Sequence, residues 1–312
     1  MKYFKNLWFA LLVISLLLVG CASNEETTTT QKDSKNEQQQ SYTVVDDRGI
    51  ELTFDKVPEK VVSLLPSNTE ILFELGAGDK VIGVTQNDTY PEEVLEIEQV
   101  ADFETVNAER IVEMNPDIIF ASSSNEGQIE QLESTGLKVF VIESALTIED
   151  VYGDIQQIAQ VMDVEEQGQQ IVETIKSQIA AVQEKTATIE TKKKVYFEIS
   201  PAPEVWSVGS NTFQQELMDA AGIENVFSEQ EGWFSVTEED IINVNPEVIL
   251  TTVNYAENPE AEILSRAGWS TITAIQNKQV YLIDPDIVNR QGPRIGEAIE
   301  LMAKTVYPEL FK

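Results

Sequence analysis

Residues 107–120 read NAERIVEMNPDIIF, and residues 237–250 read TEEDIINVNPEVIL. Each stretch has a helix-capping residue, a short helical segment, an Asn-Pro break and an apolar run typical of a buried strand. The two match in register over fourteen positions. A shared unit of this length favours duplication over chance reuse of a common α/β phrase, so we expect two lobes built on one plan.

Short apolar runs alternate with helical patterns on both sides of these stretches. This alternation predicts βαβ units and parallel sheets. A hairpin is expected first, with strands 42–45 and 50–54 around Asp46-Asp47-Arg48-Gly49. The other predicted strands are 61–65, 81–84, 117–121, 138–142, 194–199, 248–252 and 279–283. The predicted helices are 68–76, 107–114, 126–135, 147–162, 212–221, 237–243, 259–266 and 293–305.

One long helix is expected between the two halves, over residues 165–185. Its apolar residues fall on a single stripe, formed by Ile171, Val172, Ile175, Ile179 and Val182. Such a helix is about 30 Å long, which is enough to reach from one lobe to the other. The fold class is therefore α/β, with two Rossmann-like lobes, each with a central β-sheet, joined by one long backbone helix. A ligand cleft is expected between the lobes, and the rigid connection predicts limited opening and closing.

The N-terminus indicates the compartment. Lys2 and Lys5 precede an apolar run over residues 7–19, which is typical of a secretory signal and short for a membrane span. Leu-Val-Gly-Cys at 18–21 resembles the bacterial lipoprotein cleavage box, which implies that Cys21 is acylated; the alternative is an ordinary signal peptide with a chance Cys. The expected domains are a signal peptide (1–20), a disordered tether (21–41), an N-terminal lobe (42–163), an inter-lobe helix (164–186) and a C-terminal lobe (187–312).

The residue counts and net charge of the chain exclude several classes of function. The chain has no His and one Cys, which excludes a Ser–His–Asp triad, a Cys–His pair, His-ligated zinc and an internal disulfide. A formal charge of −33 disfavours nucleic acid and anionic lipid headgroups, so any membrane attachment is expected through a lipid anchor only. A carboxylate-pair hydrolase stays open, but Glu70 and Glu74 share a helix face and are interpreted as helix surface. A surface adhesion lipoprotein also stays open, although low-complexity sequence is confined to the tether.

Three further phrases carry a family resemblance. They are KVVSLLPSNTEILFELG at 60–76 with VIGV at 81–84, DTYP at 88–91, and RQGPRIGEAIE at 290–300. Together they resemble the helical-backbone binding proteins of ABC importers, which serve cobalamin, ferric siderophores and haem. The resemblance covers residues 42–312, and the PSNTE and DTYP phrases are most similar to the cobalamin-binding branch. It implies an extracellular substrate-binding lipoprotein that is not an enzyme and delivers its ligand to a permease dimer with ATPase subunits.

The expected ligand site lies in the cleft, at loops that follow strand ends. The candidate loops are 66–68, 85–90, 101–105, 201–206, 231–235 and 284–290. They carry four aromatic residues, Tyr90, Phe103, Trp206 and Trp233. Aromatic loops of this kind favour a flat apolar ligand such as a corrin or porphyrin ring; the alternative is that each ring fills a lobe core.

The resemblance also implies individual roles. Tyr90, Phe103 and Trp233 match pocket aromatics, with Phe103 standing where a Trp can occur. Asp286 and Arg290 match polar groups that face an amide-bearing ligand rim. The remaining candidates for ligand binding are Pro66, Ser67, Asn68 and Trp206, whereas Trp269 is interpreted as structural.

The small number of Arg residues and the absence of His indicate which ligand to expect. Of the five Arg in the chain, Arg290 and Arg294 are expected near the cleft, which is few for an anionic ferric siderophore. Haem iron would have no His ligand here. Cobalamin or a related corrinoid is therefore the predicted ligand, with a ferric siderophore or haem as the alternative, and we expect no resident cofactor or metal.

Glu109 and Glu239 occupy equivalent positions in the two repeated stretches. One acidic residue per lobe suits contact with two copies of one permease subunit, and the family resemblance implies the same docking. The alternative is that Glu is simply favoured in a first helical turn. A monomer at the outer face of the cell membrane is the expected state.

Overall fold

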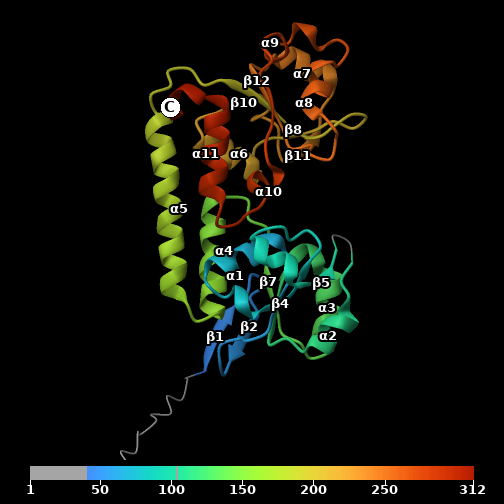
Figure 1. The fold of residues 1–312 in the computed structure, drawn as a ribbon, viewed down its shortest axis with the longest axis vertical. Coiled ribbons are helices and arrows are strands. Elements are labelled where there is room, and N and C mark those ends of the chain that lie inside the picture. The colour runs from blue at the N-terminus through green and yellow to red at the C-terminus, as the bar shows by residue number, and fades with distance from the viewer. Residues whose placement is uncertain (1–40, 103–104) are drawn as a thin grey trace, which may run out of the picture. The chain divides into compact units, whose positions relative to one another are not determined.

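The computed structural model describes residues 41–102 and 105–312 (Figure 1). The predicted signal peptide, Cys21, all of the predicted tether except its last residue, and Phe103 lie outside the described residues. Within the described part, no helix has both the length and the apolar composition of a membrane span.

The N-terminal lobe contains a hairpin and a parallel sheet of five strands. The hairpin pairs β1 (Tyr42–Val45) with β2 (Glu51–Phe54) in antiparallel register, as predicted. The sheet order is β5-β4-β3-β6-β7, and every residue of β6 and β7 is buried, as suits a parallel sheet covered on both faces. Its strands are β3 (Val61–Ser63), β4 (Val81–Thr85), β5 (Glu98–Ala101), β6 (Ile118–Ser122) and β7 (Val139–Ile142). Its helices are α1 (Pro66–Glu74), α2 (Ala108–Met114), α3 (Glu126–Ser134) and α4 (Ile148–Val161).

The C-terminal lobe has a sheet in the order β11-β9-β8-β12-β13, with β10 pairing on β8. Most of its pairs are parallel, but β9 runs antiparallel to both neighbours, β8 and β11. The strands are β8 (Lys194–Ser200), β9 (Trp206–Val208), β10 (Glu224–Asn225), β11 (Trp233–Ser235), β12 (Val248–Thr251) and β13 (Val280–Leu282). The helices are α6 (Phe213–Ala220), α7 (Glu238–Val244), α8 (Pro259–Leu264), α9 (Thr273–Gln276), α10 (Pro285–Val288) and α11 (Ile295–Val306).

The repeated stretches fold alike. Asn107 and Thr237 each cap a helix by accepting the backbone N–H three residues on. Both helices end on a left-handed Asn, Asn115 at φ 48° and Asn245 at φ 47°. The amide N of Asp117 then donates to Lys60 O at 2.8 Å, and that of Glu247 donates to Lys194 O at 2.8 Å. The duplicated helix–strand unit that the sequence predicts is therefore present in both lobes.

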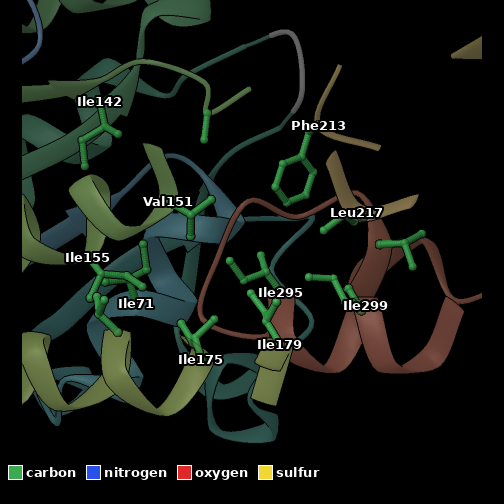
Figure 2. Close-up of a cluster of buried hydrophobic side chains, with 14 of the residues drawn as sticks. Ile71, Ile142, Val151, Ile155, Ile175, Ile179, Phe213, Leu217, Ile295 and Ile299 are labelled. Carbon is green, nitrogen blue, oxygen red and sulfur yellow. The ribbon is translucent and has the colours of Figure 1, made fainter. Parts of the chain in front are cut away.

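The long helix is α5 (Glu165–Thr186), which packs against α4 of the N-terminal lobe and α11 of the C-terminal lobe (Figure 1). Its stripe residues Val172, Ile175, Ile179 and Val182 are buried. Figure 2 shows Ile175 and Ile179 among buried side chains from α1, α4 and α11. A single continuous core cluster thus spans both lobes, which makes the connection between them stiff.

Asp154 is a buried acid on α4, with 9% of its surface exposed. Burial, followed by the nearby carboxylates of Asp47 and Asp150, raises its pKa to about 8. The unfolded chain releases this proton near the ordinary value of 3.8, whereas the native protein holds it to about pH 8. Asp154 therefore lowers the free energy of unfolding progressively as pH rises from about 4 to about 8.

We expect Asp154→Asn to raise the free energy of unfolding at pH 8 by about 2–4 kcal/mol and to have little effect at pH 4. Urea unfolding at both pH values measures this difference. Glu166→Gln, at an exposed position on α5, is the control and keeps the native pH profile. Equal stabilisation at the two pH values would show that ionisation of Asp154 is not the cause.

Candidate functional site

A cleft of about 600 Å³ lies between the two lobes. Its walls are built where strands end: after β3, β4, β5 and β6 in one lobe, and after β12 and at α10 in the other. This is where parallel α/β sheets place their ligands. The lining residues are Leu64, Leu65, Pro66, Thr85, Gln86, Asn87, Thr89, Asp102, Asn125, Asn254, Asp286 and Arg290.

Half of the lining residues carry a side-chain amide or hydroxyl. Gln86, Asn87, Asn125 and Asn254 each bring a side-chain amide, which both donates and accepts hydrogen bonds. Such groups fix the orientation of a ligand without demanding a charge on it.

Asp88 holds the start of the loop after β4 through hydrogen bonds. The buried Oδ2 of Asp88 accepts from the Thr85 hydroxyl at 2.6 Å and from the Thr85 amide at 2.8 Å. Burial raises the pKa of Asp88, while hydrogen bonds from Thr69 and Thr85 and the charge of Arg290 oppose the rise. The orientation of the cleft wall at Thr85–Thr89 therefore depends on a carboxyl group behind it.

The lobes are joined at the cleft by a polar group that we call the clasp, formed by Glu70, Thr89, Asp286, Arg290 and Arg294. Arg290 Nη1 donates to Glu70 Oε1 at 2.7 Å. Arg294 donates to Glu70 Oε2 through Nε at 2.8 Å and to Oε1 through Nη2 at 2.7 Å. The Thr89 hydroxyl donates to Asp286 Oδ2 at 2.6 Å. Two guanidinium groups of one lobe thus hold one carboxylate of the other.

The clasp is largely shielded from water. Glu70 is 1% exposed at its side chain, and Arg290 and Arg294 are 12% and 13% exposed. Burial alone lowers the pKa of Arg294, but the Glu70 carboxylate outweighs this effect and raises it overall. The Arg294 guanidinium also lies 4.1 Å from the centroid of the Tyr90 ring, a cation–π contact. Glu70 is therefore not the surface residue that the helical pattern suggested.

Some of the expected site residues line the cleft, namely Pro66, Asp286 and Arg290. The expected loop at 66–68 is wrong, because Pro66 occupies the first turn of α1 and starts the helix there. Ser67 and Asn68 are consequently buried in that turn, 5% and 1% exposed.

Tyr90, Trp206 and Trp233 are exposed, and none of the three is among the residues that line the cleft. Tyr90 covers Arg294 and borders a second hollow, against α5. Trp206 and Trp233 are 36% and 45% exposed on the paired strands β9 and β11, so neither fills a core, as the alternative required. The Trp233 indole N–H donates to Gln214 Oε1 at 3.2 Å, and Gln214 donates to Asn289 Oδ1 at 3.0 Å. Trp233 is thus tied to the residue before Arg290 without lining the cleft.

Glu109 and Glu239 are exposed in the first turns of α2 and α7, each two residues after the equivalent cap. Trp269 is fully buried in the C-terminal lobe, as expected of a structural residue. Sequence reasoning missed the amide lining, because Asn and Gln are common in any loop and carry no distinctive spacing.

Two α/β lobes with strand-end loops around a shared cleft, joined by one backbone helix, define a binding protein of the two-lobed transport class. The sequence profile described as "Periplasmic binding protein" matches residues 61–287, and the chain belongs to this family. It is an ABC transporter substrate-binding protein, and its relatives include vitamin B12-binding proteins.

Individual relatives agree with this assignment. An uncharacterized ABC transporter substrate-binding lipoprotein of Bacillus subtilis is 38% identical, over 100% of both chains. A vitamin B12-binding protein of Vibrio parahaemolyticus is 30% identical, over 77% of this chain and 86% of its own. A solved structure described as a possible iron-binding protein, from Staphylococcus epidermidis, has a TM-score of 0.74 and 30% identity, and covers 81% of this chain and 100% of its own.

The clasp predicts a stability difference between two arginines. Arg294→Gln removes two charged hydrogen bonds from the buried Glu70, so we expect it to lower the free energy of unfolding by about 2–4 kcal/mol. Arg110→Gln is the matched control, because Arg110 also pairs with two carboxylates, Glu98 and Glu113, but at the surface. That change should cost much less, because exposed ion pairs contribute little to stability in water. Urea unfolding measures both, and equal losses would contradict the account of the clasp.

Proposed function

We propose that this protein captures cobalamin or a related corrinoid at the outer face of the cell membrane and delivers it to an ABC permease. The observation that carries the ligand proposal is the cleft lining, which is rich in amides and hydroxyls and whose Arg290 is already paired. A corrinoid is a large ring with an amide-bearing rim, and amide groups such as Gln86 and Asn254 can pair with that rim in both directions.

The same lining suits the other ligands of the group less well. The propionates of haem and the carboxylates of many ferric chelates call for free guanidinium or ammonium groups. Among the described residues of the lining, Arg290 is the only cation, and Glu70 and Asp286 occupy it. The described lining also includes no Tyr, Met or His to ligate a haem iron.

The exposed indoles of Trp206 and Trp233 lie on the same face of the β9–β11 ribbon, because Trp233 is opposite Val208 and Trp206 is opposite Ser235. Trp233 is joined to Asn289 through Gln214, next to a residue of the cleft. We propose that the two indoles of this ribbon contact the flat ring of the ligand when the ligand enters the cleft beside the C-terminal lobe.

Membrane attachment and permease docking belong to the same proposal. The Leu-Val-Gly-Cys sequence at 18–21, together with a Bacillus relative named as a lipoprotein, supports an acylated Cys21 as the anchor. Glu109 and Glu239, exposed at matching positions of the two lobes, are proposed to meet two permease subunits. The relatives are named as a substrate-binding lipoprotein and a vitamin B12-binding protein, which supports a transport role without catalysis.

Isothermal titration with cyanocobalamin tests the ligand. We expect saturable one-to-one binding by the native protein and a loss of about 3- to 10-fold in affinity for Asn254→Ala, the value of one neutral hydrogen bond. Asn243→Ala, at an exposed position on α7, is the matched control and should bind as the native protein does. Binding of haemin or a ferric siderophore without binding of cyanocobalamin would contradict the proposal.

Docking is tested by charge reversal. The double variant Glu109→Arg/Glu239→Arg should abolish uptake of labelled ligand in cells while its affinity in titration stays native. Glu166→Arg/Glu184→Arg introduces the same change of charge on exposed α5 positions and should leave uptake intact. Native uptake by the first double variant would remove the docking role.

A further inference from the structure

Glu70 neutralises the positive charge at the inner wall of the cleft. We propose that Glu70 is a specificity-determining residue, which closes the cleft to anionic ligands by holding both Arg290 and Arg294.

Both terminal nitrogens of Arg290 already donate hydrogen bonds within the protein. Its Nη1 donates to Glu70 Oε1 at 2.7 Å, and its Nη2 donates to Asn87 O at 2.9 Å and Thr89 Oγ1 at 2.7 Å. Its Nη2 also lies 3.0 Å from Asp286 Oδ2. An entering carboxylate would have to displace one of these acceptors, since a guanidinium binds a carboxylate best with two parallel donors.

The charge is balanced within the clasp. Glu70 and Asp286 offset Arg290 and Arg294 there. Asp102 also lines the cleft. An anion that enters the cleft therefore finds no net positive charge at the clasp, whereas a neutral ligand requires none.

Arg290 remains a potential anion site if Glu70 loses its charge. In Glu70→Gln the side chain keeps its length, but the two nearly buried guanidinium groups lose the carboxylate that both of them contact, and Arg290 is left paired with the partly exposed Asp286. Such groups gain from a new anionic partner, because their burial is then less well compensated. A carboxylate-bearing ligand would supply that partner from the cleft.

The inference deepens the proposed corrinoid function and relies on it for the choice of neutral ligand. The exclusion of anions by Glu70 depends only on the cleft and the clasp. The corrinoid function and the exclusion of anions can therefore fail separately in one experiment, provided that an anionic and a neutral probe are titrated into the same proteins.

The experiment compares haemin, a flat ring with two carboxylates, with cyanocobalamin as the neutral probe. We expect the ratio of haemin affinity to cyanocobalamin affinity to rise by about tenfold or more in Glu70→Gln, the scale of one charge-assisted hydrogen bond. Glu74→Gln removes the same charge one turn further along α1, where the side chain is exposed, and is expected to keep the native ratio. The double variant Glu70→Gln/Arg290→Gln should return to the native ratio, because the freed cation is gone.

A second single variant, Asp286→Asn, tests the same proposal if Glu70→Gln does not fold. Asp286→Asn removes the partly exposed partner of Arg290 and should raise the ratio by about threefold, as a weaker charge partner does. Native ratios in both folded single variants, or a raised ratio that persists in the double variant, would overturn the proposal. If the native protein binds no cyanocobalamin, the proposed function fails, and the change in haemin affinity alone still decides whether Glu70 excludes anions.

Discussion

The arrangement of the cleft depends on one buried carboxylate, Glu70, shared by two guanidinium groups of the opposite lobe. A pair buried this deeply contributes little net stability compared with an apolar contact, but breaking it leaves uncompensated charge. The lobes therefore have one favoured spacing at the clasp. Because Arg290 belongs both to the clasp and to the cleft lining, the same contact sets the geometry and the charge of the binding site.

Helix α5 supplies the second constraint. It packs against α4 and α11, and its buried side chains join the cores of the two lobes into one cluster. With the lobes braced by a helix and tied by the clasp, the cleft is largely formed before a ligand arrives. Preorganisation of this kind lowers the ordering cost of capture, and it makes the lining residues, more than lobe closure, the source of selectivity.

Much of the fold could be predicted from the sequence, because many of its helices and strands depend on local sequence patterns. The repeated helix–strand unit, the hairpin and the stripe of α5 all have short-range signals, and each is present. The strands β9 and β11, at three residues each, are too short to show periodicity. The burial of Glu70 could not be predicted for a different reason. Its spacing from Glu74 suggests an exposed helix face, whereas its partners Arg290 and Arg294 lie 220 and 224 residues away in the sequence. The sequence also does not show that Tyr90 covers Arg294, or that Tyr90, Trp206 and Trp233 are not among the residues that line the cleft, because both depend on contacts between distant segments.

A crystal structure of the protein with bound cyanocobalamin is the decisive measurement. We expect the corrin ring between the lobes, its amides within hydrogen-bonding distance of Gln86, Asn87 or Asn254, and Glu70 still bound by Arg290 and Arg294. A ligand bound elsewhere, or an Arg290 released from Glu70 to contact the ligand, would show that the cleft and the clasp do not select the ligand in this way.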